Sequence, residues 1–497
     1  MSSKSSAIVI GSGFGGLALA IRLQSAGIAT TVVEARDRPG GRAYAWKHDG
    51  YTFDAGPTVI TDPACLEELW SLSGNNMADD VTLLPVDPFY RMIWNDGTQF
   101  DYSNDEGLLD AEIAKLDSSD IEGYARFLEY SKAVYEEGYV KLGAVPFLNF
   151  TSMIKAAPAL ARHKAWRSVY SVVASFVQNE QLRQILSFHT LLVGGNPMRT
   201  SSIYALIHQL EKLGGVWFAK GGTNALIDAM VALFQRLGGM LFLGEKVGKI
   251  THSGRRVTGV ITEAGVHLAA TMVASNADLV GTYAMIGESD YARRKVVGLK
   301  RKRFSPSLFV VHFGLNGTFP GIAHHSILFS DRYGPLLEDI YDRGRLPEDP
   351  SIYLHHPSAS DPDMAPSGKS AFYALAPVPH LGAEQIDWER EGARYRSVVL
   401  GRVRDLLIPD LDQRLDTCFH YTPLDFSADL GAHLGSAFSL EPILTQSAWF
   451  RGHNRDDHFR NLFLVGAGTH PGAGIPGVVG SAKATASLMM ASPSSPS

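Results

Sequence analysis

Cysteine, excess positive charge and long apolar runs are all scarce in this sequence of 497 residues. Its two cysteines, Cys65 and Cys418, are too few for a disulfide framework or a thiolate metal cage, which is typical of a protein of the reducing cytosol. The 45 basic residues are outnumbered by 51 acidic ones, so we do not expect the basic surface of a nucleic-acid-binding protein. No run reaches the roughly 18 apolar residues of a membrane-spanning helix, and the segment before Ala7 lacks the apolar core of a secretory signal.

The sequence also lacks the motifs of metal binding and of nucleophilic catalysis. The 17 histidines include the adjacent pairs His324 with His325 and His355 with His356, but no HxxxH or carboxylate–histidine pattern accompanies them. Neither a Walker loop nor a Gly-x-Ser-x-Gly elbow is present. We therefore expect no metal site, assign these histidines a structural role and name no catalytic side chain.

Glycine, by contrast, is abundant, with 49 residues beside a hydrophobic content of 45%. These values are typical of a folded α/β protein with many turns. The length exceeds what one hydrophobic core usually organises, so we expect two or more domains.

The clearest local pattern opens the chain. Residues 7–10 have the composition of a buried strand, residues 17–24 that of a helix, and residues 31–34 that of a second strand with an acid, Glu34, at its end. A glycine turn, Gly11-Ser12-Gly13-Phe14-Gly15-Gly16, joins the first strand to the helix. This order of strand, glycine turn, helix, strand and acid predicts a dinucleotide-binding unit.

Each glycine of the turn has a physical reason to be there. Gly11 permits the tight turn, Gly13 lets the backbone approach a pyrophosphate, and Gly16 lets the helix pack closely on the sheet. The N-terminus of the helix then offers free N–H groups and partial positive charge to the phosphates. Glu34 is placed to accept hydrogen bonds from ribose hydroxyls.

A second glycine cluster lies near the other end of the sequence. Gly466-Ala467-Gly468-Thr469 follows a predicted strand at residues 461–465, and residues 471–480 lead into a predicted helix at residues 481–489. An FAD molecule is too long for one strand–helix–strand unit to cover. A second turn beside a helix N-terminus, if it meets the first, can hold the flavin and stabilise negative charge on its reduced ring.

Several segments resemble known flavoproteins. Residues 35–43, with Arg36, Gly41 and Arg42, resemble the segment that follows the acid in the flavin amine oxidase superfamily. Residues 53–60, 191–197, 376–382, 446–450 and 466–477 are similar to the bacterial-type phytoene desaturases of carotenoid synthesis. The resemblance runs from about residue 7 to residue 490, and the middle and C-terminal segments make it specific.

The resemblance implies FAD as cofactor and an α/β fold, with a Rossmann-like FAD-binding domain of the amine oxidase/GDI type and an α+β substrate domain. We expect the FAD-binding domain at residues 1–85, 221–279 and 455–497. The substrate-binding domain is expected at residues 86–220 and 280–454, with a helical, membrane-facing region at about 120–212. The implied cofactor-contacting residues are Gly11, Gly13, Phe14, Gly15, Gly16, Glu34, Arg36, Gly41, Arg42, Gly56, Pro57, Thr58, Val247, Gly466, Ala467, Gly468, Ile475, Pro476, Gly477 and Val478.

An apolar C40 polyene is the substrate that the resemblance implies, with 15-cis-phytoene desaturated towards lycopene or neurosporene. A CH₂–CH₂ unit between alkenes has no heteroatom to polarise, so we expect the flavin to accept a hydride before the neighbouring carbon loses a proton. The electrons then pass to a quinone or dioxygen. The insertions are rich in aromatic residues that collectively suit an apolar tunnel: Phe127, Tyr130, Tyr135, Tyr139, Phe147, Phe150, Trp166, Tyr170, Phe176 and Phe188.

Residues 146–167 mix apolar and basic side chains, a composition that suits a helix lying in the membrane interface. The alternative is a solvent-exposed helix packed on its own domain. We expect a cytoplasmic protein that associates peripherally with the inner face of the cell membrane.

Other functions stay open at this point. One is a related flavoenzyme with another substrate, such as a carotenoid isomerase, another carotene desaturase or an amine oxidase. An amine oxidase predicts polar recognition in place of an apolar tunnel. Another is a non-catalytic isoprenoid-binding protein similar to the GDP-dissociation inhibitors, which need not keep both glycine clusters.

Overall fold

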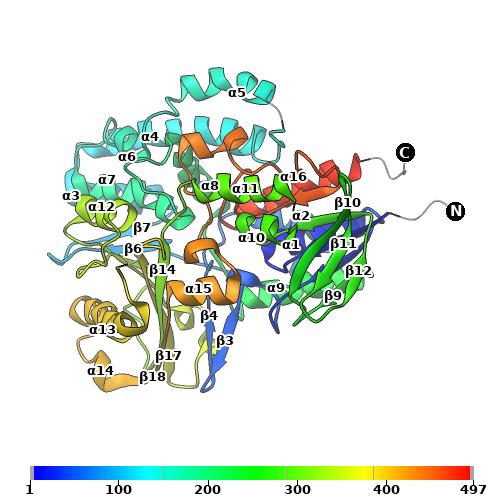
Figure 1. Cartoon of the computed structure of the whole chain (residues 1–497). Coiled ribbons are helices and arrows are strands. Elements are labelled where there is room, and N and C mark those ends of the chain that lie inside the picture. The colour runs from blue at the N-terminus through cyan, green and yellow to red at the C-terminus, as the bar shows by residue number, and fades with distance from the viewer. Residues whose placement is uncertain (1–4, 149, 288, 384, 493–497) are drawn as a thin grey trace.

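Two β-sheets of different construction carry the fold (Figure 1). The structure is a computed structural model and describes residues 5–148, 150–287, 289–383 and 385–492. The first sheet has five parallel strands, in the order β19 (Leu462–Leu464), β13 (Met272–Ser275), β1 (Ser6–Ile10), β2 (Ala29–Val33) and β9 (Met240–Phe242). It therefore joins strands from the beginning, the middle and the end of the chain.

Both faces of the five-stranded sheet are covered, as expected for parallel strands. On one face, Ala7 and Val9 of β1 pack in the same core as helices α1 (Phe14–Ser25), α2 (Pro63–Ser71), α9 (Thr223–Arg236) and α16 (Ile475–Met490). On the other face, Ile8 and Ile10 pack against an antiparallel sheet of β10 (Val247–Ser253), β11 (Arg256–Thr262) and β12 (His267–Ala269). Because successive side chains of β1 point to opposite faces of the sheet, this strand contributes to both cores.

The two helices that follow the glycine turns begin earlier than the sequence predicts. Helix α1 begins at Phe14 in place of residue 17, because Gly13, with an extended backbone, is already its N-cap. Helix α16 begins at Ile475 in place of residue 481, with Pro476 in its first turn, where a missing N–H costs nothing. Both glycine turns are therefore short, and each ends in a helix N-terminus.

The second sheet has seven strands, all antiparallel except the β15–β6 pair. In spatial order they are β18 (Leu415–Tyr421), β14 (Ser307–Asn316), β17 (Lys369–Val378), β16 (Ile352–His355), β15 (His325–Leu328), β6 (Tyr90–Ile93) and β7 (Gln99–Tyr102). Helix α13 (Trp388–Leu406) packs with Phe309 and Phe372 on one face. The opposite face carries Tyr353, Tyr373 and Leu375, which line a cavity described below.

Helices gather beyond the β6 and β7 edge of this sheet, and α5 is the outermost of them in Figure 1. This region contains α3 (Glu106–Asp117), α4 (Asp120–Tyr135), α5 (Phe150–Arg162), α6 (Val169–Val173), α7 (Glu180–Ser187) and α8 (Leu206–Gly214). The remaining helices are α10 (Leu279–Met285), α11 (Asp290–Lys300), α12 (Tyr333–Glu338), α14 (Leu411–Arg414) and α15 (Pro423–Leu430). Two short antiparallel pairs, β3 (Ala45–His48) with β4 (Tyr51–Asp54) and β5 (Leu83–Pro85) with β8 (Trp217–Ala219), complete the described strands. Among the described helices, none combines the length and the hydropathy that crossing a bilayer requires.

Candidate functional site

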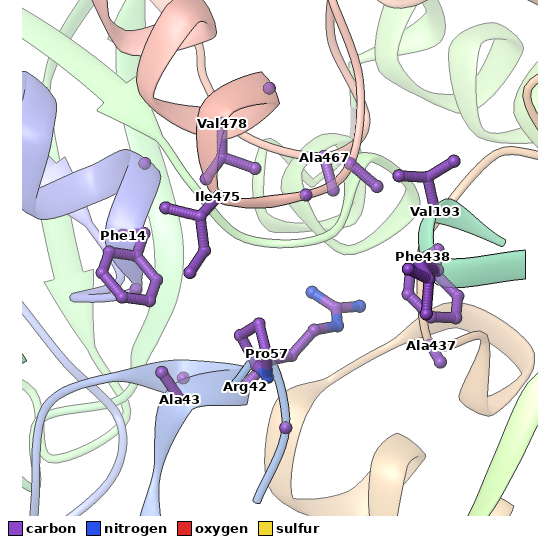
Figure 2. Close-up of a pocket in the computed structure, with 18 of the residues that line it drawn as sticks. Phe14, Arg42, Ala43, Pro57, Val193, Ala437, Phe438, Ala467, Ile475 and Val478 are labelled. Carbon is purple, nitrogen blue, oxygen red and sulfur yellow. The ribbon is translucent and has the colours of Figure 1, made fainter. Parts of the chain in front are cut away.

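One cavity of about 1110 Å³ extends from the carboxyl edge of the five-stranded sheet to the seven-stranded sheet and to helices α5 and α8. Its volume exceeds the ~300–1000 Å³ of common small-molecule sites. The space therefore suits two ligands in contact, one at each end. Figure 2 shows its middle, where Arg42 and Pro57 lie between Phe14 and Ile475 on one side and Val193 and Phe438 on the other.

The two glycine turns meet at this cavity. A Cβ on Gly15 would lie only 3.2 Å from the Cα of Gly466, and 2.8 Å from Oδ1 of Asn276. Asn276 follows β13, which lies between β1 and β19 in the sheet. Three parallel strands thus end at one place, and the residues that follow them form a continuous wall.

All predicted cofactor-contacting residues except Gly16, Gly466 and Gly468 line the cavity. These three glycines lie behind the wall, where a side chain would not fit. A Cβ on Gly16 would lie 2.0 Å from the carbonyl oxygen of Gly11, one on Gly466 would lie 2.4 Å from Asn276, and one on Gly468 would lie 2.7 Å from Leu279. Their part is to allow close packing of the turns.

Glu34 is buried and held in one orientation at the end of β2. Its Oε2 accepts hydrogen bonds from the backbone N–H and the hydroxyl of Ser12, each at 2.7 Å. Its Oε1 accepts the backbone N–H of Arg36 at 3.0 Å. The Arg36 guanidinium in turn lies 3.7 Å above the ring of Tyr44 and 3.6 Å from the carboxylate of Asp429. The carboxylate is fixed while part of its hydrogen-bonding capacity stays open towards the cavity.

Arg42 reaches into the cavity from the segment after β2 (Figure 2). One terminal nitrogen donates to the carbonyl oxygen of Ser436 at 3.2 Å, whereas its buried Nε has no partner among the described residues. Burial lowers the pKa of Arg42, and the nearby Asp278 opposes that shift. A buried guanidinium with one unpaired N–H indicates an oxygen-rich, anionic ligand.

The other end of the cavity is predominantly apolar. Its wall includes Phe147, Phe188, Leu191, Leu192, Ile203, Ile207, Leu210, Ile327, Phe329 and Leu375. Of the ten aromatic residues considered for a tunnel, Tyr139, Phe147 and Phe188 line the cavity, whereas Phe127, Tyr130 and Phe176 belong to the core below it. Trp166 is 66% exposed on the surface.

Few polar groups interrupt the apolar wall. Thr58, Tyr353 and Tyr373 form a hydrogen-bonded group where the two ends join. Glu211 is completely buried, and its carboxylate accepts the Tyr90 hydroxyl at 2.7 Å. His470 faces the cavity with its pKa lowered to about 4 by burial, and its Nε2 lies 2.8 Å from the carbonyl oxygen of Leu142. Thr58 is among the residues that the resemblance implies, and His470 lies in the segment 466–477 that carries it. The other polar residues and Asn276 escaped the sequence analysis, because no local motif distinguishes them from core residues.

Comparison with known proteins agrees with this arrangement. The profile of the family described as "Flavin containing amine oxidoreductase" matches residues 14–490. A phytoene desaturase (lycopene-forming) of Paracoccus sp. is 59% identical over 97% of this chain and 97% of its own. Another, from Pseudescherichia vulneris, is 54% identical over 97% of this chain and 98% of its own.

Among solved structures, an oxidoreductase from Methanosarcina mazei has a TM-score of 0.63 at 18% identity, covering 96% of this chain and 98% of that one. A likeness at this identity supports the fold alone. With the sequence relatives, it places the chain in the flavin-containing amine oxidoreductase fold class. Within that class, the chain belongs to the bacterial-type phytoene desaturases, a family of FAD-dependent enzymes that oxidise CH–CH bonds.

Proposed function

We propose that this protein is an FAD-dependent desaturase that introduces double bonds into 15-cis-phytoene, with lycopene as the end product. The observation that supports it most is one continuous cavity, which reaches from the two glycine turns to a predominantly apolar wall. The two relatives reported above are both described as lycopene-forming, which favours lycopene over neurosporene.

The residues at the sheet end fit an FAD. The N-terminus of α1 and the glycines before it leave backbone N–H groups for the diphosphate, with the orphaned Nε of Arg42 as a further donor. Glu34 is oriented for the ribose hydroxyls, Val247 lines the part expected to hold adenine, and the N-terminus of α16 faces the flavin end. When bound, the cofactor supplies the hydride acceptor that no side chain offers.

At the other end, the protein aligns the polyene and excludes water. A delocalised cation forms on the substrate when it loses a hydride, and water in the cavity would capture that cation. The apolar wall of Phe188, Leu191 and Leu192 disfavours water. An amine oxidase predicts polar or aromatic-caged recognition of its substrate, whereas this wall is predominantly apolar.

We further propose that α5 docks on the inner face of the cell membrane. Ile154 in α5 and Trp166 after it are 59% and 66% exposed, and Arg162 and Lys164 are exposed beside them. On the inner side, Met153 and Leu160 line the cavity. An apolar substrate can then pass from lipid to the cavity under one helix, and basic groups at the rim suit anionic headgroups.

Reconstitution tests the enzymatic function. The protein is incubated with FAD and phytoene-containing liposomes, with a quinone or dioxygen as electron acceptor in separate arms. We expect product absorption to move to longer wavelength with each added double bond and to end at the lycopene spectrum. Product that stops at neurosporene would correct the end point, and bound FAD with no polyene product would refute the desaturase function.

Liposome co-sedimentation tests the membrane surface. Ile154→Glu with Trp166→Glu should weaken binding to anionic vesicles by at least about tenfold, because two apolar side chains no longer enter the interface. Met240→Glu is the matched control, since Met240 is 55% exposed at the edge of the five-stranded sheet. Equal sedimentation of both proteins would contradict docking through α5.

A further inference from the structure

A row of hydrogen-bonded side chains leads from the cavity wall into the seven-stranded sheet. The hydroxyl oxygens of Tyr373 and Thr58 lie 2.7 Å apart, and those of Thr58 and Tyr353 lie 3.0 Å apart. The Tyr353 hydroxyl lies 2.7 Å from Nδ1 of His325. Thr58, Tyr353 and Tyr373 line the cavity, whereas His325 is completely buried behind them. One hydroxyl group thus connects the substrate space to a buried imidazole.

Strand register fixes this connection. Tyr353 pairs with Ile327, two residues from His325 on β15, and with Leu375, two residues from Tyr373 on β17. Since side chains two residues apart share a face, the rings of Tyr353, His325 and Tyr373 are diagonal neighbours on the face towards the cavity. The rigid sheet therefore holds the hydroxyl and the imidazole in place before any ligand arrives.

Aromatic rings surround His325. Its nearest ring neighbours are His324, Tyr353 and His355, with centroids at 4.5, 5.6 and 5.5 Å, and the ring of Tyr90 lies at 5.8 Å. Its Nε2 is buried and has no hydrogen-bond partner in the part of the chain that the structure describes. Two buried carboxyl groups lie around this group: that of Glu211 accepts the Tyr90 hydroxyl, and that of Asp54 lies near Tyr353 and Tyr373.

We propose that Tyr353 is a catalytic residue, which takes up the proton that the polyene loses in each desaturation and passes its own hydroxyl proton to Nδ1 of His325. This proposal rests on the proposed desaturase function. It assigns a destination to the second hydrogen of the reaction, since the first leaves as a hydride to the flavin.

Atoms and charges balance in this step. Hydride loss leaves an allylic cation, and the C–H bond on the adjacent carbon then breaks. Its electron pair becomes the π bond of the new alkene, and its proton goes to the Tyr353 oxygen while the Tyr353 proton crosses to His325. The tyrosine stays neutral and the imidazole becomes an imidazolium. After the product leaves, the same hydroxyl returns the proton to water.

A weak base suffices here, because an allylic cation is a far stronger acid than an imidazolium. Burial lowers the pKa of His325 to about 3, so the ring is neutral before the step and releases its proton readily afterwards. Burial also lowers the pKa of His324 and of His355, so neither neighbour opposes the incoming charge with a charge of its own. A stronger base would hold the proton and block the next desaturation.

Glu211 is the rival acceptor, because it too lines the cavity. Its carboxylate already accepts the Tyr90 hydroxyl, and its second oxygen lies 3.0 Å from Nε2 of His189. These contacts direct its two oxygens towards Tyr90 and His189, whereas the Tyr353 hydroxyl lies beside Thr58, where the two ends of the cavity join. The Glu211→Gln variant is therefore included as a comparison in the experiment described next.

Isotope effects measured on the FAD-bound enzyme distinguish Tyr353 from Glu211 as the proton acceptor. Phytoene is deuterated separately at each carbon of the bond that is oxidised, and Tyr353→Phe is compared with Tyr373→Phe, whose hydroxyl contacts Thr58. In Tyr353→Phe we expect turnover to fall about 10²-fold and a new isotope effect to appear at the proton-losing carbon. Tyr373→Phe should keep the wild-type isotope pattern. A purely structural loss would slow both cleavages without changing that pattern.

Two results would overturn the relay: a wild-type isotope pattern in Tyr353→Phe, or the new pattern in Glu211→Gln alone. The wild-type protein serves as the separate check, because lack of product there refutes the desaturase function itself. FAD content of each variant, read from the flavin absorbance, shows whether the cofactor end is intact.

A second measurement needs no turnover. Nitrogen NMR of the histidine-labelled protein should show Nδ1 of His325 unprotonated, as an acceptor must be, with the resonance assigned by its loss in His325→Gln. The Tyr353→Phe substitution should shift the Nδ1 resonance of His325. A protonated Nδ1 in the wild-type protein would exclude the relay. One nitrogen from each of His324, His325 and His355 lies within 4.8 Å of the others, so elemental analysis that found a tightly bound transition metal would exclude it as well.

Discussion

The two ends of the cavity are built by opposite means. At the five-stranded sheet, the wall consists largely of backbone, with glycines where a side chain would collide. At the other end, where the seven-stranded sheet, α8 and the segment 188–193 meet, it consists of apolar side chains such as Phe188, Leu192 and Leu210. A backbone wall needs one residue type at each position, whereas an apolar wall needs only volume and hydrophobicity. Substitutions at the two ends should therefore fail in different ways.

The largest effect is expected at Gly16. In Gly16→Ala the new Cβ would lie 2.0 Å from the carbonyl oxygen of Gly11, and a backbone atom cannot move aside without opening the turn. We expect a loss of about 1–3 kcal/mol in stability and a fall of about 100-fold in FAD affinity. Flavin fluorescence titration and thermal unfolding measure both. Gly298→Ala in helix α11, where nothing lies within 4 Å of the added Cβ, is the control.

A polar substitution in the apolar wall should have the next largest effect. It should weaken binding of the polyene and leave binding of FAD unchanged. Leu192→Asn places an amide without a partner in the cavity, at a cost of about 1–3 kcal/mol in polyene binding, or roughly 5- to 150-fold. FAD binding should stay at the wild-type value. Leu192→Met keeps the size and hydrophobicity and should retain turnover. Loss of FAD from the Asn variant alone would mean that the two ends are not independent.

Substitution of Arg42 should also weaken FAD binding, but by a smaller factor than Gly16→Ala does. Arg42→Met removes the orphaned donor, and we expect FAD affinity to fall about tenfold, since a hydrogen bond to a charged group contributes about 1.5 kcal/mol or more. Arg38→Met, at an exposed position in the same segment, should bind FAD normally. If both variants bind FAD like the wild type, Arg42 does not contact the cofactor.

The smallest effect is expected in the pH dependence of protein stability, and it comes from Asp54. Burial raises the pKa of Asp54 from 3.8 to about 7. The unfolded chain therefore releases this proton at lower pH than the folded one, and the stability should decrease as the pH rises from about 4 to about 7. Asp54→Asn should remove that decrease, with a melting temperature a few degrees above wild type at pH 8 and no gain at pH 4. An unchanged pH profile in Asp54→Asn would contradict the raised pKa.

The same contrast explains what could be predicted from the sequence. The turn from Gly11 to Gly16 and the acid Glu34 were predictable because backbone geometry demands those residues at that spacing. The beginnings of α1 and α16 were predicted too late, since Gly13 and Pro476 read as loop residues although they cap and open the helices. Asn276 escaped prediction because its importance lies in its place after a central strand.

The hydrogen-bonded group where the two ends of the cavity meet could not be predicted from residue types and their spacing. Tyr353 and Tyr373 have the composition of ordinary strand residues, and Thr58 belongs to a segment identified only by resemblance. Their contact depends on an antiparallel register that brings β15, β16 and β17 together, and on the packing of Thr58 against that sheet. Long-range pairing of this kind leaves no periodic trace in any one segment.

The position of β19 at one edge of the five-stranded sheet has a consequence for biosynthesis. The turn from Gly11 to Gly16 is synthesised long before the wall that faces it, from Ala467 to Val478. A nascent chain must therefore keep its first strand–helix–strand unit folded, or protected by a chaperone, with half a nucleotide site open to solvent. A cofactor can be enclosed only once β19 and the turn after it have been made and β19 has paired with β13.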